Sequence, residues 1–386
     1  MSEHDPRTGA QYTPLEHLDE RRSLANTPLR KFFEAAVRYE ASDLLLRGGQ
    51  VPKLRIRGDL KSVEADALAP DEFEKWIESS LSPTQWQSYS THGSIDVGVD
   101  FEMNQAGTRR FRINIYRTRG RSALAARRVN SEILDFEHLH LPQSVGEIAD
   151  GRQGLVLICG ITGSGKSTTI ASMLQYINER RSCHMVTIED PIEYLFVDAK
   201  AVVSQREIGI DVPNFPIGLR ALVREDPDVV FIGELRDKET FEAALQAAET
   251  GHLVFSTIHA SSSSQAFGRI YDLFPAPERD GIRHMLAYHM RAVLYQKLMA
   301  TILDDPPVVP AVEVLRNSPT VRKYILEGRE GELTQVIKGS REDGMQAFLD
   351  SLVELVDKQL IHPHTAQAEA PSAEEVKMRL RGIKTS

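Results

Sequence analysis

A glycine-rich stretch, Gly-Ile-Thr-Gly-Ser-Gly-Lys-Ser at 160–167, lies between an apolar run and a periodic pattern. The run at 155–158, Leu-Val-Leu-Ile, is typical of a buried strand, and the apolar spacing after the stretch predicts a helix over 166–179. The stretch itself fits the pattern G-x-x-x-x-G-K-[ST]. Because a strand precedes it and a helix follows it, we interpret it as a phosphate-binding loop rather than a chance glycine-rich turn.

Each residue type in this loop suits the binding of a nucleoside triphosphate. Glycines let backbone N–H groups approach phosphate oxygens, and the helix N-terminus adds partial positive charge. Lys166 is long enough to reach the β- and γ-phosphates, and Ser167 can bind Mg²⁺. The predicted nucleotide contacts are Gly160, Thr162, Gly163, Ser164, Gly165, Lys166, Ser167 and Thr168.

Composition narrows the classes of protein. A chain of 386 residues predicts two or three domains. The net charge of −9, from 46 basic and 55 acidic residues, argues against a general nucleic-acid binder. Two cysteines, Cys159 and Cys183, cannot form a four-thiolate zinc site and favour a reducing compartment. No apolar run approaches the roughly 20 residues of a membrane span, so we expect a cytoplasmic protein.

Changes of pattern divide the chain into segments. Residues 1–27 are polar and aperiodic, which predicts a flexible extension. Residues 28–138 predict a small α+β domain. Its expected helices lie at 28–41, 71–81 and 83–89, and its expected strands at 44–46, 54–57, 95–101, 111–116 and 124–129. The last two strands form a hairpin at Gly120 that is rich in arginine: Arg109, Arg110, Arg112, Arg117, Arg119, Arg121, Arg127 and Arg128. For most of these arginines a solvated strand face is sufficient explanation.

Strands alternate with helices over 139–363, which favours an α/β domain whose mostly parallel sheet is covered on both faces. The expected strands lie at 155–158, 185–188, 229–232, 253–258 and 308–314. The expected helices lie at 166–179, 215–224, 238–248, 282–299, 320–326 and 345–360. Residues 364–386 are predicted to be a polar tail, with a short helix at 374–380.

Acidic side chains follow two more of these strands, at the edge of a parallel sheet where ligands bind. Glu234 follows the strand at 229–232 and suits Mg²⁺, although a solvated loop acid would look the same. Glu189, Asp190 and Glu193 crowd the end of the strand at 185–188, which indicates water activation or metal binding. Alternatively, Asp190 caps a helix and Glu193 closes a capping box.

Two histidines, His252 and His259, lie at the two ends of the strand at 253–258. Their odd spacing points the side chains to opposite faces, which argues against a shared metal. His259 follows the carboxyl end of the strand, where it could hydrogen-bond a phosphate or an attacking water. A structural role is the alternative for each histidine.

Together, these four segments resemble the Walker A loop, the aspartate box, the atypical Walker B strand and the histidine box of the secretion and type IV pilus ATPase superfamily. The order and spacing agree over 28–360, and the stretches Glu-Asp-Pro-Asp-Val-Val-Phe-Ile-Gly-Glu-Leu-Arg-Asp and Ala-Glu-Thr-Gly-His-Leu-Val-Phe-Ser-Thr-Ile-His are close matches. The resemblance implies an ATP-hydrolysing hexameric ring motor. It also implies a RecA-like P-loop NTPase domain, a PAS-like N-terminal domain and C-terminal helices.

Within the superfamily, the chain is most similar to the retraction motors of twitching motility. Its N-terminal part has room for one small domain, and the cysteine-rich zinc insert is absent because no cysteine follows Cys183. The retraction motors' Ala-Ile-Arg-Asn-Leu-Ile-Arg-Glu motif is reduced to Arg322 and its apolar spacing. An accessory retraction paralogue is therefore one alternative, and an extension or type II secretion ATPase is another. A non-motor ATP-binding regulator and a nucleic-acid-translocating ring are further alternatives.

The resemblance also implies roles for single residues and for partners. Glu193 matches the general base that orients the attacking water, Glu234 matches the Mg²⁺-site acid, and His259 matches the γ-phosphate sensor. Arg112 and Arg127, or Arg128 in place of Arg127, match arginines that reach the phosphates. The implied partners are a homohexamer, the inner-membrane platform protein of a type IV pilus and a second motor paralogue, with no direct nucleic acid. The implied location is peripheral, at the cytoplasmic face of the inner membrane.

Overall fold

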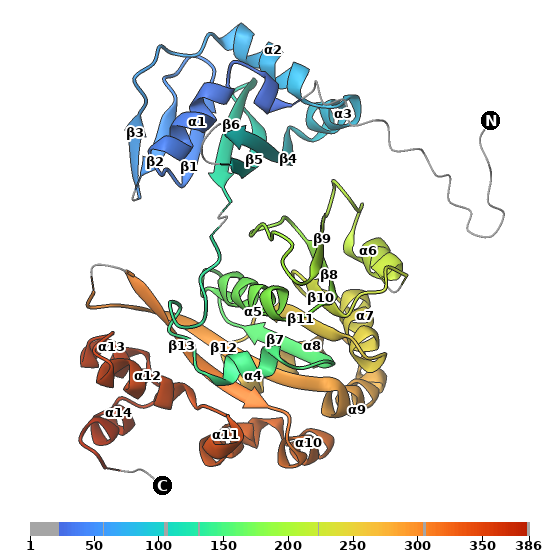
Figure 1. Cartoon of the computed structure of the whole chain (residues 1–386), viewed down its shortest axis with the longest axis vertical. Coiled ribbons are helices and arrows are strands. Elements are labelled where there is room, and N and C mark those ends of the chain that lie inside the picture. The colour runs from blue at the N-terminus through green and yellow to red at the C-terminus, as the bar shows by residue number, and fades with distance from the viewer. Residues whose placement is uncertain are drawn as a thin grey trace, which may run out of the picture. The chain divides into compact units, whose positions relative to one another are not determined.

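The structure is a computed structural model that describes residues 23–56, 58–103, 107–129, 132–222, 224–303 and 306–383. The chain forms two compact units that divide at Ser131 (Figure 1). Most of the predicted flexible extension, residues 1–22, lies outside the described residues, as do residues 384–386 of the predicted tail. The last part of that extension contributes to the first unit, because Leu24–Asn26 forms a 3-10 helix in which Leu24 is buried.

The first unit ends at Ser131, whereas the predicted domain ran to residue 138, and it is built on an antiparallel sheet with strand order β3-β2-β1-β6-β5-β4. The strands are β1 (Asp43–Arg47), β2 (Lys53–Ile56), β3 (Asp59–Ser62), β4 (Ser94–Met103), β5 (Gly107–Thr118) and β6 (Arg121–Arg128). The helices are α1 (Arg30–Arg38), α2 (Pro70–Ser80) and α3 (Pro83–His92). Phe33 of α1 stacks on Phe101 of β4 with ring centroids 4.2 Å apart, so the helix covers one face of the sheet. The predicted hairpin joins β5 and β6.

The second unit contains a seven-stranded sheet with the order β13-β12-β7-β11-β10-β8-β9. All pairs are parallel except β12 with β13, which confirms the predicted mostly parallel sheet. The strands are β7 (Gly154–Cys159), β8 (His184–Glu189), β9 (Val202–Glu207), β10 (Val229–Ile232), β11 (Leu253–Ile258), β12 (Met290–Ala300) and β13 (Val308–Arg316). Every residue of β7, β10 and β11 is buried, as expected for strands covered on both faces.

Helices cover both faces of this sheet (Figure 1). They are α4 (Ser144–Ala149), α5 (Lys166–Arg180), α6 (Phe215–Leu222), α7 (Lys238–Glu249), α8 (Ser263–Asp272), α9 (Arg279–His289), α10 (Pro319–Leu326) and α11 (Leu333–Gly339). One core contains residues of α7, α8 and α9, and the other contains residues of α4 and α5. The sheet is thereby held at its faces, and its strand ends stay available for loops.

The predicted long helix at 282–299 is wrong. Helix α9 ends at His289, and β12 begins at the next residue and runs between β7 and β13. Its composition, Met-Arg-Ala-Val-Leu-Tyr-Gln-Lys-Leu-Met-Ala, favours a helix, but the strand bonds partners on both sides: Val293 pairs with Leu157 of β7 and with Leu315 of β13. Burial between two strands therefore outweighs intrinsic helix propensity here.

The C-terminal helices α12 (Phe348–Asp357), α13 (Pro363–Glu369) and α14 (Ala373–Leu380) form a small core with β12 and β13. The short helix predicted at 374–380 is confirmed as α14. Residues of the predicted polar tail take part in the packing, since Ala366 and Val376 are both fully buried. Within the described part of the chain, no helix has both the length and the apolarity to cross a membrane.

Candidate nucleotide site

The phosphate-binding loop connects β7 to α5, as the sequence predicts. Gly165 is the N-cap residue of α5, and the ammonium group of Lys166 donates to the carbonyl oxygens of Gly160 and Ile161, both at 3.0 Å. The chain turns so tightly that a Cβ atom at Gly160 would lie 2.4 Å from both the Gln296 carbonyl oxygen and Ser164 Oγ. Glycine is therefore required where the strand ends.

A buried glutamine on β12 braces the loop. The Gln296 amide Nε2 donates to the Ser164 carbonyl oxygen at 2.8 Å, and its Oε1 accepts from the Thr169 hydroxyl at 2.7 Å. Gln296 is 2% exposed, so both bonds are shielded from water. Gln296 was not among the predicted site residues, because its segment was predicted to be part of a helix. The one sequence signal that could have identified Gln296 is a polar residue within a mainly apolar segment.

Glu234 and His259 lie together beside Lys166, as expected from the strand ends. The Glu234 carboxylate is 2.8 Å from Arg236 Nη2 and 3.4 Å from His259 Nε2. Burial lowers the pKa of Lys166, and the negative charges of Glu234 and Glu193 act in the opposite direction. Glu193 and Glu234 thus lie within electrostatic range of Lys166, and His259 contacts Glu234.

The segment after β8 is irregular, so the alternative of a capped helix at Asp190 is wrong. Glu193 is exposed on this segment, while Glu189 at the end of β8 is only 5% exposed. The Glu189 carboxylate accepts from the Thr187 hydroxyl at 2.7 Å and from the Glu193 backbone N–H at 3.4 Å. Burial raises the pKa of Glu189 to about 7. Glu189 is therefore an internal support of the segment that carries Glu193.

Two further polar side chains connect this segment to its neighbours. Gln205 of β9 donates through Nε2 to the Tyr194 carbonyl oxygen at 2.8 Å and to Glu189 Oε1 at 3.3 Å. The Tyr194 hydroxyl lies 2.7 Å from Thr168 Oγ1, in the first turn of α5. The Glu193 segment is thereby tied to the phosphate-binding loop. The sequence carries no signal for Gln205, because it lies in a strand that lacks an apolar pattern.

The two histidines, His252 and His259, make different kinds of contact. His252 precedes β11, and its Nδ1 lies 2.9 Å from the Ala247 carbonyl oxygen, which is a structural contact at the amino end of the strand. His259 follows the carboxyl end of β11 and contacts Glu234. The expectation that they do not share a metal agrees with these positions at opposite ends of one strand.

The arginines named in the sequence analysis lie in the first unit. Arg112 of β5 and Arg127 of β6 are directly opposite each other across the two strands, and both are exposed. Arg128 is opposite the buried Phe111, so its side chain projects from the other face of the sheet. Arg127 Nε also pairs with Asp43 Oδ1 at 2.9 Å. The register thus brings Arg127, and not Arg128, beside Arg112.

Two oxygen donors suited to a magnesium ion, Ser167 and Glu234, lie near Lys166. Ser167 is the second residue of α5, and Glu234 follows β10 at the same edge of the sheet. A hydroxyl and one carboxylate agree with the preference of Mg²⁺ for oxygen ligands and retained waters. Among the described residues, no cluster of three or more acidic, histidine or cysteine side chains offers a different kind of metal site. The donor set therefore fits Mg²⁺ bound together with a phosphate.

Comparisons with known proteins agree with this geometry. Residues 109–329 match the family described as type II/IV secretion system protein. The chain is 37% identical over 84% of its length to a twitching motility protein of Neisseria gonorrhoeae, covering 86% of that protein. It is 40% identical over 82% of its length to the uncharacterized protein YggR of Escherichia coli K12, covering 94% of it. The crystal structure of the pilus retraction motor PilT with bound ADP superimposes with a TM-score of 0.81 at 38% identity, covering 90% of this chain and 98% of that one. The chain is therefore a member of the type II/IV secretion system protein family, with the fold of the PilT retraction motor.

Proposed function

We propose that this protein is a Mg²⁺-dependent ATPase that powers the retraction of type IV pili. Its main support is the grouping of Lys166, Glu193, Glu234 and His259 at one sheet edge, next to a phosphate-binding loop, in a chain with this relationship to PilT. The gonococcal relative is named a twitching motility protein. A role in pilus retraction accounts for both the grouping of these residues and the similarity to a twitching motility protein.

In the proposed reaction, the loop and Lys166 bind the β- and γ-phosphates, and Glu193 accepts a proton from the attacking water as the general base. His259 hydrogen-bonds the γ-phosphate from the end of β11. Ser167 and Glu234 would hold Mg²⁺, which stabilises charge on the phosphate oxygens when bound. Glu189, Gln205 and Thr168 keep the Glu193 segment in position through the hydrogen bonds described above.

Arg112 and Arg127 are proposed to stabilise the charge that develops on the transferred phosphoryl group. Both guanidinium groups lie on one exposed sheet face, which makes them available to a nucleotide held by another surface. A rigid-body movement of the first unit against the second would couple hydrolysis to mechanical work. We further propose a homohexameric ring, located in the cytoplasm against the inner membrane, that acts on the platform protein of the pilus, alone or beside a second motor paralogue.

The biochemical test uses the purified full-length protein. ATP turnover should depend on Mg²⁺ and stop when the metal is chelated, and Lys166→Ala should weaken nucleotide binding. Lys358→Ala removes an exposed lysine elsewhere on the second unit and is the matched control for the loss of one positive charge. Unchanged nucleotide affinity in Lys166→Ala would contradict the site.

The test of direction is the amount of surface pilus sheared from cells that carry Lys166→Ala at the native locus. Excess pili with lost motility would support retraction. Absent pili would instead identify an extension or secretion ATPase. Normal piliation and motility would identify an accessory paralogue, and the ATPase assignment would then rest on the turnover measurements alone.

A further inference from the structure

A buried carboxylate on β13 contacts the start of the helix that follows His259. Glu313 is 5% exposed, and its Oε1 accepts from the Ser263 backbone N–H at 2.9 Å. Ser263 is the first residue of α8, and three residues without regular secondary structure separate it from His259. Glu313 therefore fixes the point at which the segment that carries His259 joins the helix.

Strand register also places Glu313 in line with the phosphate-binding loop. Tyr295 of β12 is opposite Glu313 of β13 and opposite Cys159 of β7, so the three residues form one row across the sheet. Cys159 directly precedes Gly160, the first glycine of the loop, and its Sγ lies 3.7 Å from the Ser262 carbonyl oxygen. The residue before α8 thus contacts the strand that leads into the loop, while the first residue of α8 contacts Glu313.

The same carboxylate also reaches the C-terminal helices. Burial raises the pKa of Glu313, while hydrogen bonds from Ser263 and from the backbone of Phe348 lower it. Phe348 is the first residue of α12, and its ring centroid lies 5.2 Å from that of Tyr295. The free N–H groups and the dipole at a helix N-terminus favour a carboxylate there. One buried side chain therefore joins the first residues of two helices, α8 and α12.

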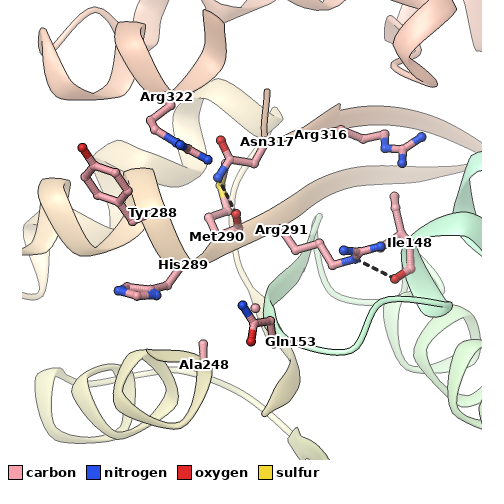
Figure 2. Close-up of a pocket in the computed structure, with 11 residues that line it drawn as sticks. Ile148, Gln153, Ala248, Tyr288, His289, Met290, Arg291, Arg316, Asn317 and Arg322 are labelled. Carbon is pink, nitrogen blue, oxygen red and sulfur yellow. Dashed lines mark hydrogen bonds between the residues drawn. The ribbon is translucent and has the colours of Figure 1, made fainter. Parts of the chain in front are cut away.

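Side chains that bind helix ends also occur in the second unit away from the nucleotide site. A cavity of about 260 Å³ at the amino end of β7 contains two examples (Figure 2). Arg291 Nε donates to the Ile148 carbonyl oxygen at 2.9 Å, near the end of α4. Asn317 Nδ2 donates to the Met290 carbonyl oxygen at 2.7 Å, just after α9. Glu313 differs from both because the helix that it caps follows the proposed γ-phosphate contact.

Building on the proposed function, in which His259 contacts the γ-phosphate, we propose that Glu313 is a positioning residue for that histidine. It holds Ser263 at the start of α8 and so determines where the segment from His259 to the helix lies. Its contact with Phe348 makes that position depend on the packing of the C-terminal helices. Because Glu313 acts only through the histidine, its loss should affect the contact to the γ-phosphate and leave the binding of the other two phosphates intact.

The test measures the nucleotide affinities and the ATP turnover of full-length Glu313→Gln. The glutamine keeps the shape of the side chain and removes its charge, and charge-assisted hydrogen bonds are roughly twice as strong as neutral ones. Affinity for a non-hydrolysable ATP analogue and ATP turnover should each fall about 2-fold to 10-fold, the range expected for one hydrogen bond. Affinity for ADP, which lacks the γ-phosphate, should stay at the wild-type value.

Glu330→Gln is the matched control. Glu330 is also buried, at 8% exposed, and accepts from the Tyr271 hydroxyl at 2.5 Å near the other end of α8. The substitution removes a carboxylate contact from the same helix, so it should leave the ratio of ATP-analogue affinity to ADP affinity unchanged. An equal change of that ratio in Glu330→Gln would show that any weakening of the packing of α8 is sufficient, which would exclude a specific role of Glu313.

A double variant separates action through the histidine from an independent effect. His259→Ala should itself lower turnover and the affinity for the ATP analogue, and adding Glu313→Gln should then cause no further change in either. Losses that multiply in the double variant, or a wild-type affinity ratio in Glu313→Gln alone, would overturn the proposal. Wild-type turnover and affinities in His259→Ala would instead contradict the proposed role of the histidine in the reaction, and with it the role of Glu313.

Discussion

The two sheets of this molecule present the side chains of the proposed site in different ways. Strands β7 and β11 are buried along their whole length, and the second unit carries Lys166, Glu234 and His259 just beyond the ends of its strands. In the first unit, β5 alternates from the buried Phe111 and Ile113 to the exposed Arg112, so functional groups can stand on the sheet face itself. A sheet covered on both faces leaves only its edges for chemistry, whereas an antiparallel sheet covered on one face also offers the other.

This difference between the two sheets determines how each site side chain is held in position. A side chain at a strand end depends on an irregular segment, and that segment needs partners of its own, as Glu193 depends on Glu189 and on the anchoring of Tyr194 by Gln205. A side chain on a sheet face is positioned by the strand register, as Arg112 and Arg127 are. The position of a side chain at a strand end of the second unit should therefore change when its supporting residues are substituted. The position of a side chain on the sheet face of the first unit should depend mainly on the exposed residue itself.

The largest expected effect is at the edge, with Glu193→Gln. If Glu193 is the general base, this substitution should lower ATP turnover by about 10²–10⁴-fold while nucleotide binding and thermal stability stay close to wild type. Steady-state turnover and equilibrium binding of a fluorescent ATP analogue would measure the two separately. Turnover within a few-fold of wild type would show that another group activates the water.

A second expected effect lies on the sheet face, with Arg112→Gln. If this guanidinium stabilises developing charge, turnover should fall on the order of 10²–10³-fold, as for other preorganised donors. Arg112 is exposed, so the melting temperature should not change. Arg121→Gln is the control, because Arg121 lies on β6 with Arg127, six residues from it and on the same face. Equal losses in the two variants would indicate a general effect of charge on the first unit.

The comparison also shows why some of the fold was predictable. Fully apolar strands such as β7 and β10, each followed by a helix pattern, identify a covered parallel sheet. Strand β12 was mistaken for a helix because its residues favour helices and only its place between β7 and β13 makes it a strand. Strands β3 and β9 lacked an apolar signal, since β3 is exposed throughout and β9 is largely polar. Local patterns therefore predict strands that carry an apolar or alternating pattern, including the edge strands β4 and β13, and they miss strands without such a pattern.

The residues of the candidate site likewise fall into a group that the sequence predicts and a group that it does not. Lys166, Glu234 and His259 follow strand ends that the sequence reveals, so their association could be predicted. Gln296 and Gln205 come from strands that were not predicted, and their roles depend on contacts over 132 and 11 residues of sequence separation respectively. A buried glutamine has no motif of its own. The groups proposed to contact the nucleotide leave a sequence pattern, whereas the groups that hold them in place are found only through tertiary contacts.

The burial of Glu189 predicts a pH-dependent stability that an exposed acid would not give. Since burial raises its pKa from 4.5 to about 7, the folded protein keeps a proton that the unfolded chain releases. This stabilisation is full below about pH 4.5 and is lost by about pH 7, at a cost of about 3 kcal/mol. The free energy of unfolding of wild type, minus that of Glu189→Gln, should therefore decrease by up to about 3 kcal/mol between about pH 5 and pH 8.

Urea unfolding at several pH values would measure this difference. Glu179→Gln, which removes an exposed acid at the end of α5, should leave the pH dependence of stability as in wild type. A difference between wild type and Glu189→Gln that is constant with pH would mean that Glu189 is solvated. The edge would then be supported by an ordinary surface acid, and the contrast with the sheet face would weaken.

The smallest expected effect tests whether the Glu193 segment is truly tied to the phosphate-binding loop. Tyr194→Phe removes only the hydroxyl that lies 2.7 Å from Thr168 Oγ1. One such hydrogen bond is worth about 0.5–1.5 kcal/mol, so turnover should fall about 2-fold to 10-fold with little change in nucleotide affinity. Tyr176→Phe, which removes a hydroxyl bonded to Asp150 near the other end of α5, is the matched control and should not affect turnover. A loss confined to Tyr194→Phe means that the edge depends on its anchoring contacts, whereas no loss in either variant means that Glu189 and Gln205 hold the segment without help from α5.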